Sequence, residues 1–223
     1  MNDMLSIGAS GVRAYQTALG VVSDNIANAG TVGYSRRAAQ LAEIAPAGAI
    51  GLAARVGIPG NGVVVQGIER SADAYKTSAV RIASTDLARS ETGIAWMNRV
   101  QSVLTQGSVP ARMTSFFAAA QSLAADPTSS STRAAMLEAG ATTAAAFRTT
   151  GAALDAAAAE LDQTAASGVR QLATLGLAMA RINDGLGRAV PGSTAAAALS
   201  DDRDQLLEQM STLTDVSVQL DTA

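Results

Sequence analysis

The sequence contains neither cysteine nor histidine. Without cysteine there is no disulfide and no thiolate nucleophile, and without histidine the commonest metal ligand and general base are missing. Most hydrolytic and zinc-dependent mechanisms therefore lose their usual residues. The sequence predicts a protein that is not an enzyme and that holds no cofactor and no metal.

Aromatic residues are also scarce, at 3% of a 223-residue chain whose hydrophobic content is 48%. That hydrophobic content excludes a wholly disordered chain. Much of it is alanine, which buries little area per residue but is the strongest helix former. The β-branched and aromatic residues that favour strands are few. The composition therefore predicts a mainly α fold of helices packed closely through small side chains.

Long hydrophobic runs and basic clusters are missing as well. No stretch approaches the roughly 20 uninterrupted apolar residues of a membrane-spanning helix, and the first residues lack the basic patch and apolar run of a cleaved signal peptide. The net charge is −3, with scattered basic residues. We therefore expect no membrane insertion and no nucleic-acid partner. Export from the cell is still compatible with this sequence, because some export systems recognise an N-terminus that is not cleaved.

The first clear pattern is an amphipathic helix over residues 3–28, which closes at Gly30. Its apolar stripe recurs at steps of three and four residues and has no partner nearby in the sequence. We interpret residues 1–33 as a helix that is buried only against other molecules, which indicates self-assembly. The stripe consists of Leu5, Gly8, Val12, Tyr15, Leu19, Val22 and Ile26.

Residues 34–71 form a glycine-rich arm with little periodicity. Between residues 30 and 62 the chain has seven glycines and two prolines, which favours irregular structure. The run Val63–Ile68 is the one convincing β pattern here, and the turn-forming residues 59–62 come directly before it. We expect a small hairpin or edge strand in this arm.

A bundle of long, coiled-coil-like helices is predicted over residues 72–213. Helical periodicity indicates helices near 72–106, 111–125, 133–187 and 195–213, separated by glycine- and proline-containing turns. The third helix begins somewhere in 126–133 and keeps heptad spacing along most of its length. We expect it to pack antiparallel to the first, with a shared core of Leu87, Ile94, Met97, Leu154, Leu161, Leu172 and Leu175.

The last residues, 214–223, alternate apolar and polar from Val216 to Leu220, which predicts a strand. A strand with nothing after it to pair with suggests that the sequence is cut from a longer protein, at the start of a following β domain.

Three features resemble sites of chemistry, and each has a simpler interpretation. Residues 200–204 hold three carboxylates, but a calcium loop needs a glycine turn and wider spacing, so a negatively charged helix start is the better interpretation. The glycine-rich residues 57–62 lack the Lys-Ser or Lys-Thr of a phosphate loop. Trp96 lies among apolar residues, which favours a core or helix interface over ligand stacking.

Residues 23–36 resemble the N-terminal signature of the flagellar rod, hook and hook-associated proteins, with Asp24 where asparagine is usual. Three further segments are similar to the hook-associated protein 1 family of hook–filament junction proteins: residues 60–63 continuing through 68–70 to 73–75, residues 116–117 leading to 126–127, and residues 202–207. Rod and hook proteins usually continue into β-rich domains, whereas this chain continues into long helices.

The resemblance implies a structural component that joins hook to filament by helical self-assembly, outside the cell and after type III export without a cleaved signal. In that family the N-terminal helix pairs with a C-terminal helix in the core of the axial structure, and the bundle forms the next layer. The implied partners are the hook protein, the second junction protein, further copies in a ring and the export machinery. The expected assembly interface comprises Leu5, Val12, Leu19, Val22, Asn25, Ile26, Asn28, Gly33 and Tyr34.

Three alternatives stay open at this point. Another flagellar rod or hook axial protein shares the N-terminal signature. A signalling coiled-coil bundle also uses alanine-rich heptads, but it predicts a membrane span or a symmetric helical hairpin. An enzyme such as a wall-cutting hydrolase needs a placed acid or nucleophile, and a peptidoglycan-cleavage assay separates it from the others.

Overall fold

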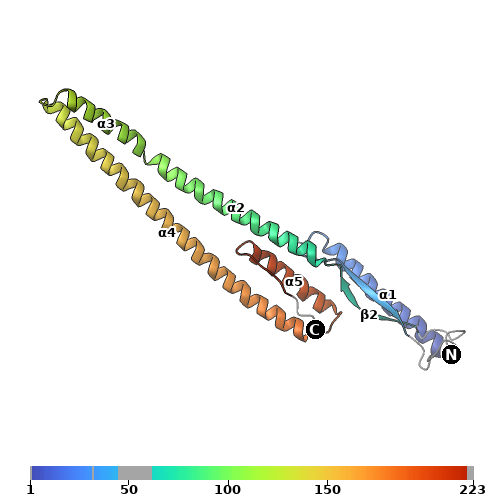
Figure 1. The fold of residues 1–223 in the computed structure, drawn as a ribbon. Coiled ribbons are helices and arrows are strands. Elements are labelled where there is room, and N and C mark those ends of the chain that lie inside the picture. Colours follow the sequence, from blue (N-terminus) through green and yellow to red (C-terminus); the bar gives the residue numbers. More distant parts are fainter. Residues whose placement is uncertain (1, 32, 45–61, 220–223) are drawn as a thin grey trace. The chain divides into compact units, whose positions relative to one another are not determined.

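The computed structural model describes residues 2–31, 33–44 and 62–219, and it divides into two compact units. One unit combines residues 1–85 with residues 172–223, and the other comprises residues 86–171. Within the described residues the fold is mainly α with one small sheet, as the sequence predicts (Figure 1). No helix in the described ranges is long and apolar enough to cross a membrane.

The helices begin and end close to the residues that the periodicity indicates. They are α1 (Asn2–Ala27), α2 (Ala74–Gln106), α3 (Val109–Ala125), α4 (Ser130–Arg188) and α5 (Thr194–Ser211). Asp73 caps α2, because its carboxylate accepts hydrogen bonds from the backbone N–H groups of Tyr75 and Lys76. The donation from Lys76 is the main reason that the pKa of Asp73 lies below its ordinary value.

The two strands belong to the first unit and form an antiparallel pair. They are β1 (Arg37–Glu43) and β2 (Val63–Arg70), with Arg37 opposite Arg70 at one end and Glu43 opposite Val63 at the other. The register shifts after Gln40, so Gln66 is the extra residue of a bulge. The predicted strand 63–68 and the small hairpin are therefore confirmed, while residues 59–61 of the turn predicted at 59–62 lie outside the described residues.

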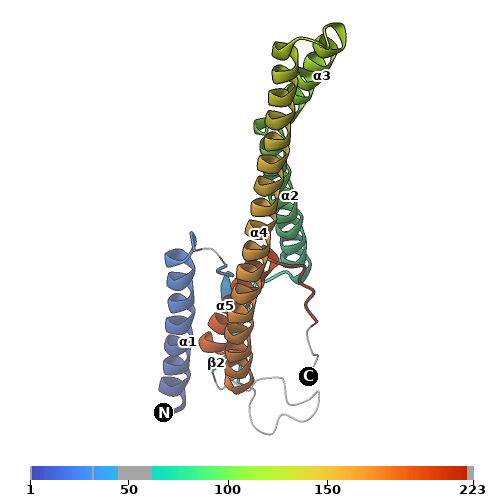
Figure 2. The same cartoon turned by 90° about the vertical axis from the view of Figure 1, so that its left-hand side faces the viewer.

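Helix α1 packs on this sheet through one face (Figure 2). Ala14 and Val21 on that face are 2% and 4% exposed. Near the N-terminal end, Ser10 Oγ accepts a hydrogen bond from the backbone N–H of Val63. Gly62 makes this approach possible, because its φ is +107° and an added Cβ would lie 2.2 Å from Ser10 Oγ. The expectation that α1 has no partner within the chain is therefore wrong, because the arm folds back as a sheet onto it.

Helix α5 completes the first unit. Figure 1 shows α5 beside the first turns of α2 and the last turns of α4. Thr85 Oγ1 donates a hydrogen bond to the backbone oxygen of Ser211, which is fully buried. In the turn before α5, the backbone oxygen of Gly192 accepts from the N–H of Ile68, directly after the β2 bulge. The strand predicted from Val216 to Leu220 is not formed over residues 216–219, which pair with no strand in the described ranges, while Leu220 lies outside these ranges. The following β domain stays a prediction.

The second unit is an antiparallel pairing of the end of α2, together with α3, against the first part of α4. Arg99 forms an ion pair of 3.1 Å with Glu160, and Thr143 Oγ1 lies 3.2 Å from the backbone oxygen of Arg112. The helices approach closely where side chains are small: a Cβ added at Gly107 would lie 2.0 Å from Thr150 Oγ1. The predicted antiparallel arrangement is confirmed.

The predicted leucine-rich core of this pairing is wrong. Leu87, Ile94, Met97 and Leu161 are 59%, 61%, 73% and 44% exposed, whereas the buried residues of α4 are Thr150 and Ala157. Leu154, Leu172 and Leu175 are half-buried. A helix with a single neighbour buries only a narrow stripe, and glycine, threonine and alanine occupy that stripe here. Trp96 is also half-buried.

We predict that Thr150→Val stabilises the protein by about 1 kcal/mol. Thr150 is 8% exposed and its hydroxyl has no hydrogen-bond partner among the described residues, so a methyl group of similar size removes a buried, unsatisfied donor. The neighbouring Thr149 is exposed, and Thr149→Val serves as the matched control with no expected change. Chemical denaturation of both variants measures the difference, and a loss of stability in Thr150→Val alone would contradict the close helix approach.

Candidate assembly site around the N-terminal helix

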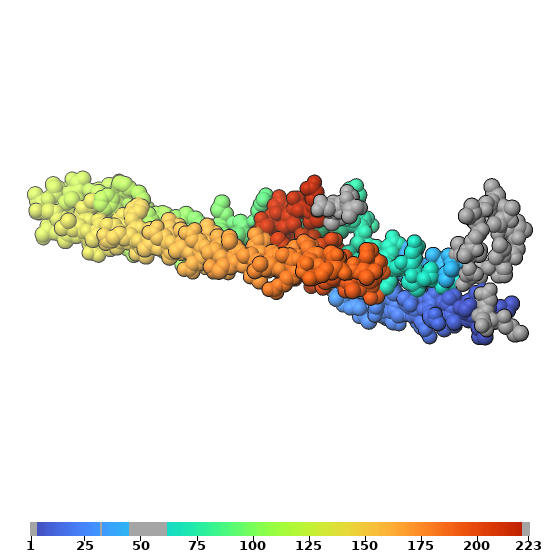
Figure 3. Space-filling model, turned by 90° about the horizontal axis from the view of Figure 1, so that it is seen from below, coloured from blue at the N-terminus to red at the C-terminus, as the bar shows by residue number. Residues whose placement is uncertain are grey.

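The expected apolar stripe of α1 lies outside the buried face that contains Ala14 and Val21, and it is open to solvent. Figure 3 shows α1 at the surface of the molecule. Tyr15, part of the same row, is 70% exposed. None of these side chains is needed to close the core of the first unit, which is formed by the other face. The exposed fractions of the remaining large side chains are Leu5 79%, Val12 59%, Leu19 67%, Val22 50% and Ile26 74%.

A groove runs between the C-terminal half of α1 and strand β1. Its volume is about 450 Å³, and the exposed side chains of Val22 and Ile26 form one rim while Ala38 and Ala39 of β1 line the other side. The lining is mainly apolar, so the stripe and the groove form one continuous apolar surface.

The polar residues expected at the interface are engaged within the chain. Asn25 clamps the start of β1, because its Oδ1 accepts from the backbone N–H of Arg37 at 2.8 Å and its Nδ2 donates to the backbone oxygen of the same residue at 2.8 Å. The hydroxyl of Tyr34 also donates to Asn25 Oδ1, at 2.9 Å. The Arg37 guanidinium lies 4.9 Å from the centre of the Tyr34 ring, a cation–π distance.

Asn28 and Gly33 shape the turn that follows α1. The backbone N–H of Asn28 donates to Asp24, and its backbone oxygen accepts from Thr31, which ends the helix. Gly33 has a φ of +82°, and a Cβ added there would lie 3.3 Å from Cβ of Gln205 in α5. This position requires glycine for both its conformation and its closeness to α5. A direct role of these two residues in contacts between molecules stays a prediction.

An ion cluster, formed by Arg37, Arg70, Asp201 and Asp204, joins the two strands to α5. Asp201 pairs with Arg37 at 2.6 Å and with Arg70 at 2.7 Å, and Asp204 pairs with Arg70 at 2.7 Å. All four side chains are 10–15% exposed. Ser35 closes the cluster, because its backbone N–H donates to Asp201 and its hydroxyl accepts from Arg70.

The cluster corrects the interpretation of residues 200–204 as a helix start. Helix α5 begins at Thr194, where the Ser193 hydroxyl accepts a hydrogen bond from the N–H of Ala196, so Asp201 lies in the middle of the helix. Its buried neighbours on the same face are Ala197 and Leu207. Across the described residues no group of three or more carboxylates is arranged to hold a metal. Sequence reasoning missed Arg37, although two aspartates three residues apart on a buried helix face are a signal for buried cationic partners.

We predict that Asp201→Ala destabilises the protein by about 3–5 kcal/mol. The substitution leaves both Arg37 and Arg70 without their shared counter-ion in a site that excludes most water. Glu160→Ala is the control, because the Arg99–Glu160 pair is 54% and 56% exposed and is worth about 1 kcal/mol or less. Urea denaturation measures both variants, and equal losses of stability would contradict a structural role for the cluster.

Comparisons with known proteins place these features in a family. Residues 97–223, more than half of the chain, match the family described as the flagellar hook-associated protein FlgK helical domain, and residues 5–34 match the flagella basal body rod protein family. No solved structure matches significantly.

Curated relatives match along nearly the whole chain. "Flagellar hook-associated protein 1" of Salmonella typhimurium is 28% identical over 98% of this chain, and the protein of the same name from Escherichia coli K12 is 26% identical over 98%. The chain spans only 39% and 40% of the length of these two relatives. The match over residues 97–223 shows that the chain belongs to the flagellar hook-associated protein family defined by the FlgK helical domain.

Proposed function

We propose that this chain is part of a structural component of the bacterial flagellum that joins the hook to the filament by helical self-assembly. The observation that carries the proposal is the division of α1 into two faces. One face is buried on the sheet through Ala14 and Val21, and the other presents a row of large apolar side chains that are 50–79% exposed. A continuous exposed apolar surface marks a site of interaction with another polypeptide.

The shape of this surface fits a helical partner. Residues at steps of three and four form a straight row along α1, which is the pattern that packs against a second helix. The groove beside Val22 and Ile26 gives such a helix a second contact, on β1. Relatives named flagellar hook-associated protein 1 support an occupant from the flagellar axial structure. The resemblance suggests a C-terminal helix of the mature protein as that occupant.

The position at the junction implies a set of partners. The hook protein on one side, the second hook-associated junction protein on the other and further copies in a ring are the contacts expected for this role. Export through the flagellar type III machinery would place the protein outside the cell. The rod-type match over residues 5–34 is shared among axial proteins in general, but the helical-domain match over residues 97–223 favours the hook-associated branch over a rod or hook protein.

The ion cluster contributes to this function indirectly. Asn25 and Tyr34 hold the end of α1 against β1, and Asp201 holds β1 and β2 against α5. These contacts fix the orientation of the exposed row relative to the rest of its unit. The signature residues therefore act by positioning the assembly helix, in addition to any contact that they make between molecules.

We predict that the double variant Leu19→Asp and Ile26→Asp, made in the protein expressed in the cell, abolishes filament attachment without lowering the melting temperature of the purified 223-residue chain. Both side chains are more than two thirds exposed, so the substitutions cost little in an isolated subunit, whereas each would bury a charge in an assembled interface. Electron microscopy of the flagella and thermal melting provide the two measurements.

Val21→Asp is the matched control, because Val21 lies on the same helix but is 4% exposed. That variant should melt at a lower temperature, since a charge is placed between α1 and the sheet. If the double variant kept normal attachment while the 223-residue chain lost its stability, the exposed row would belong to the core of the subunit and the proposal would be wrong.

A further inference from the structure

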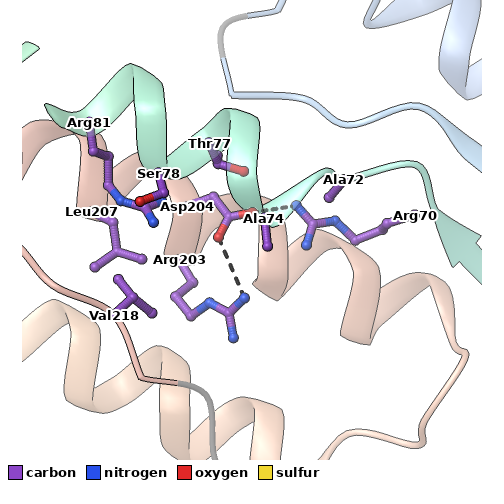
Figure 4. Close-up of a pocket in the computed structure, with 10 residues that line it drawn as sticks. All are labelled: Arg70, Ala72, Ala74, Thr77, Ser78, Arg81, Arg203, Asp204, Leu207 and Val218. Atoms are coloured by element: carbon purple, nitrogen blue, oxygen red, sulfur yellow. Dashed lines mark hydrogen bonds and ion pairs between the residues drawn. The ribbon is translucent and has the colours of Figure 1, made fainter. Parts of the chain in front are cut away.

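A cavity of about 290 Å³ lies next to the ion cluster, between the start of α2 and α5 (Figure 4). It belongs entirely to the first unit. Its wall contains three arginines from three different elements: Arg70 at the end of β2, Arg81 of α2 and Arg203 of α5. Asp204 is the one carboxylate of its lining, and the remaining lining residues are Ala72, Ala74, Thr77, Ser78, Leu207 and Val218.

The positive charges of the cavity exceed the negative ones. Asp204 is already shared, because it pairs with Arg70 at 2.7 Å and with Arg203 at 3.5 Å. Among the described residues, no ion pair or hydrogen bond reaches the guanidinium of Arg81, although the residue is only 8% exposed. Nε of Arg81 and Nε of Arg203 are both buried without a hydrogen-bond partner.

A buried guanidinium without a counter-ion is strongly unfavourable, because arginine stays protonated at every physiological pH and cannot neutralise itself. Figure 4 shows the Arg81 side chain running from α2 towards Ser78 and Leu207, and the Arg203 side chain reaching towards Asp204 from α5. A hydroxyl donor, that of Ser78, lines the same space. The cavity therefore contains several donors, with too little negative charge to satisfy them.

We propose that this cavity is a binding site for a single oxyanion, held by the guanidinium groups of Arg81 and Arg203. The planar fork of a guanidinium matches the paired oxygens of a carboxylate or a phosphate. The same oxyanion chemistry can come from a free anion or from an acidic side chain of a second copy of this chain. The site is separate from the exposed row of α1, so its failure would leave the proposed junction function untouched.

The test is a titration of the ¹⁵N-labelled protein with inorganic phosphate at constant ionic strength, followed through the arginine Nε–H signals in NMR spectra. The signals of Arg81 and Arg203 are assigned from their loss in Arg81→Lys and Arg203→Lys. We expect both to shift in a saturable manner. Because a hydrogen bond to a charged group is worth roughly one to two powers of ten in affinity, Arg81→Met should weaken phosphate binding about tenfold or more.

Arg89→Met is the matched control, because Arg89 is an exposed arginine on the same helix, and it should bind phosphate like the parent protein. Circular dichroism verifies that each variant is folded, and Arg81→Lys, which keeps the charge without the fork, replaces Arg81→Met if the latter unfolds.

In a second experiment, the same NMR spectra are recorded at increasing protein concentration without phosphate. If a second copy supplies the carboxylate, the same two signals shift with protein concentration and added phosphate reverses the association. The proposal would be overturned if the Nε–H signals of Arg81 and Arg203 shifted neither with added phosphate nor with protein concentration. It would also be overturned if the parent protein and Arg81→Met bound phosphate with equal affinity.

Discussion

The bifurcated pairing of Asp201 with Arg37 and Arg70 is the contact on which the first unit depends. It brings the beginning of β1 and the end of β2 to the middle of α5, and Asp201 is 164 residues from Arg37 and 131 residues from Arg70 along the chain. Among the described residues of this unit, few large apolar side chains are buried, with Val21 and Leu207 as the main ones. Because so little apolar area is buried, a charge cluster with directional hydrogen bonds has to define the relative positions of these elements.

This dependence explains why the signature after α1 is polar. Asn25 satisfies both backbone groups of Arg37, and Arg37 in turn stacks on Tyr34 and pairs with Asp201. A single chain of contacts therefore runs from the end of α1 through β1 to α5. The row of large apolar side chains on the exposed face of α1 takes no part in this chain of contacts and stays open to solvent.

The helices could be predicted from the sequence, because helical periodicity and turn-forming residues depend only on residues close together in the chain. Periodicity and the turns at Gly107–Pro110 and Pro191–Gly192 placed helix ends within a few residues of those observed. A hairpin was predicted in the arm, but the residues of β1 were not located, because their apolar pattern is weak and their pairing with β2 is non-local. The strand predicted from Val216 to Leu220 is wrong over its described residues, 216–219, for the complementary reason, since alternation alone cannot make a strand without a partner edge. Asp201 and Asp204 were noticed as a motif, but their burial depends on arginines that only the fold brings near.

The heptad pattern of α2 and α4 predicted the pairing of the helices but not the degree of burial. A heptad stripe records which side chains avoid water in the assembled state, and it does not say whether the covering surface belongs to the same chain. In the second unit, Ile94 and Met97 stay exposed although they lie on the stripe, just as Leu19 and Ile26 do on α1. The two exposed surfaces share one physical cause: mostly small side chains, such as Ala14 on α1 and Thr150 and Ala157 on α4, fill the contacts within the chain, so the larger apolar side chains of these helices stay exposed.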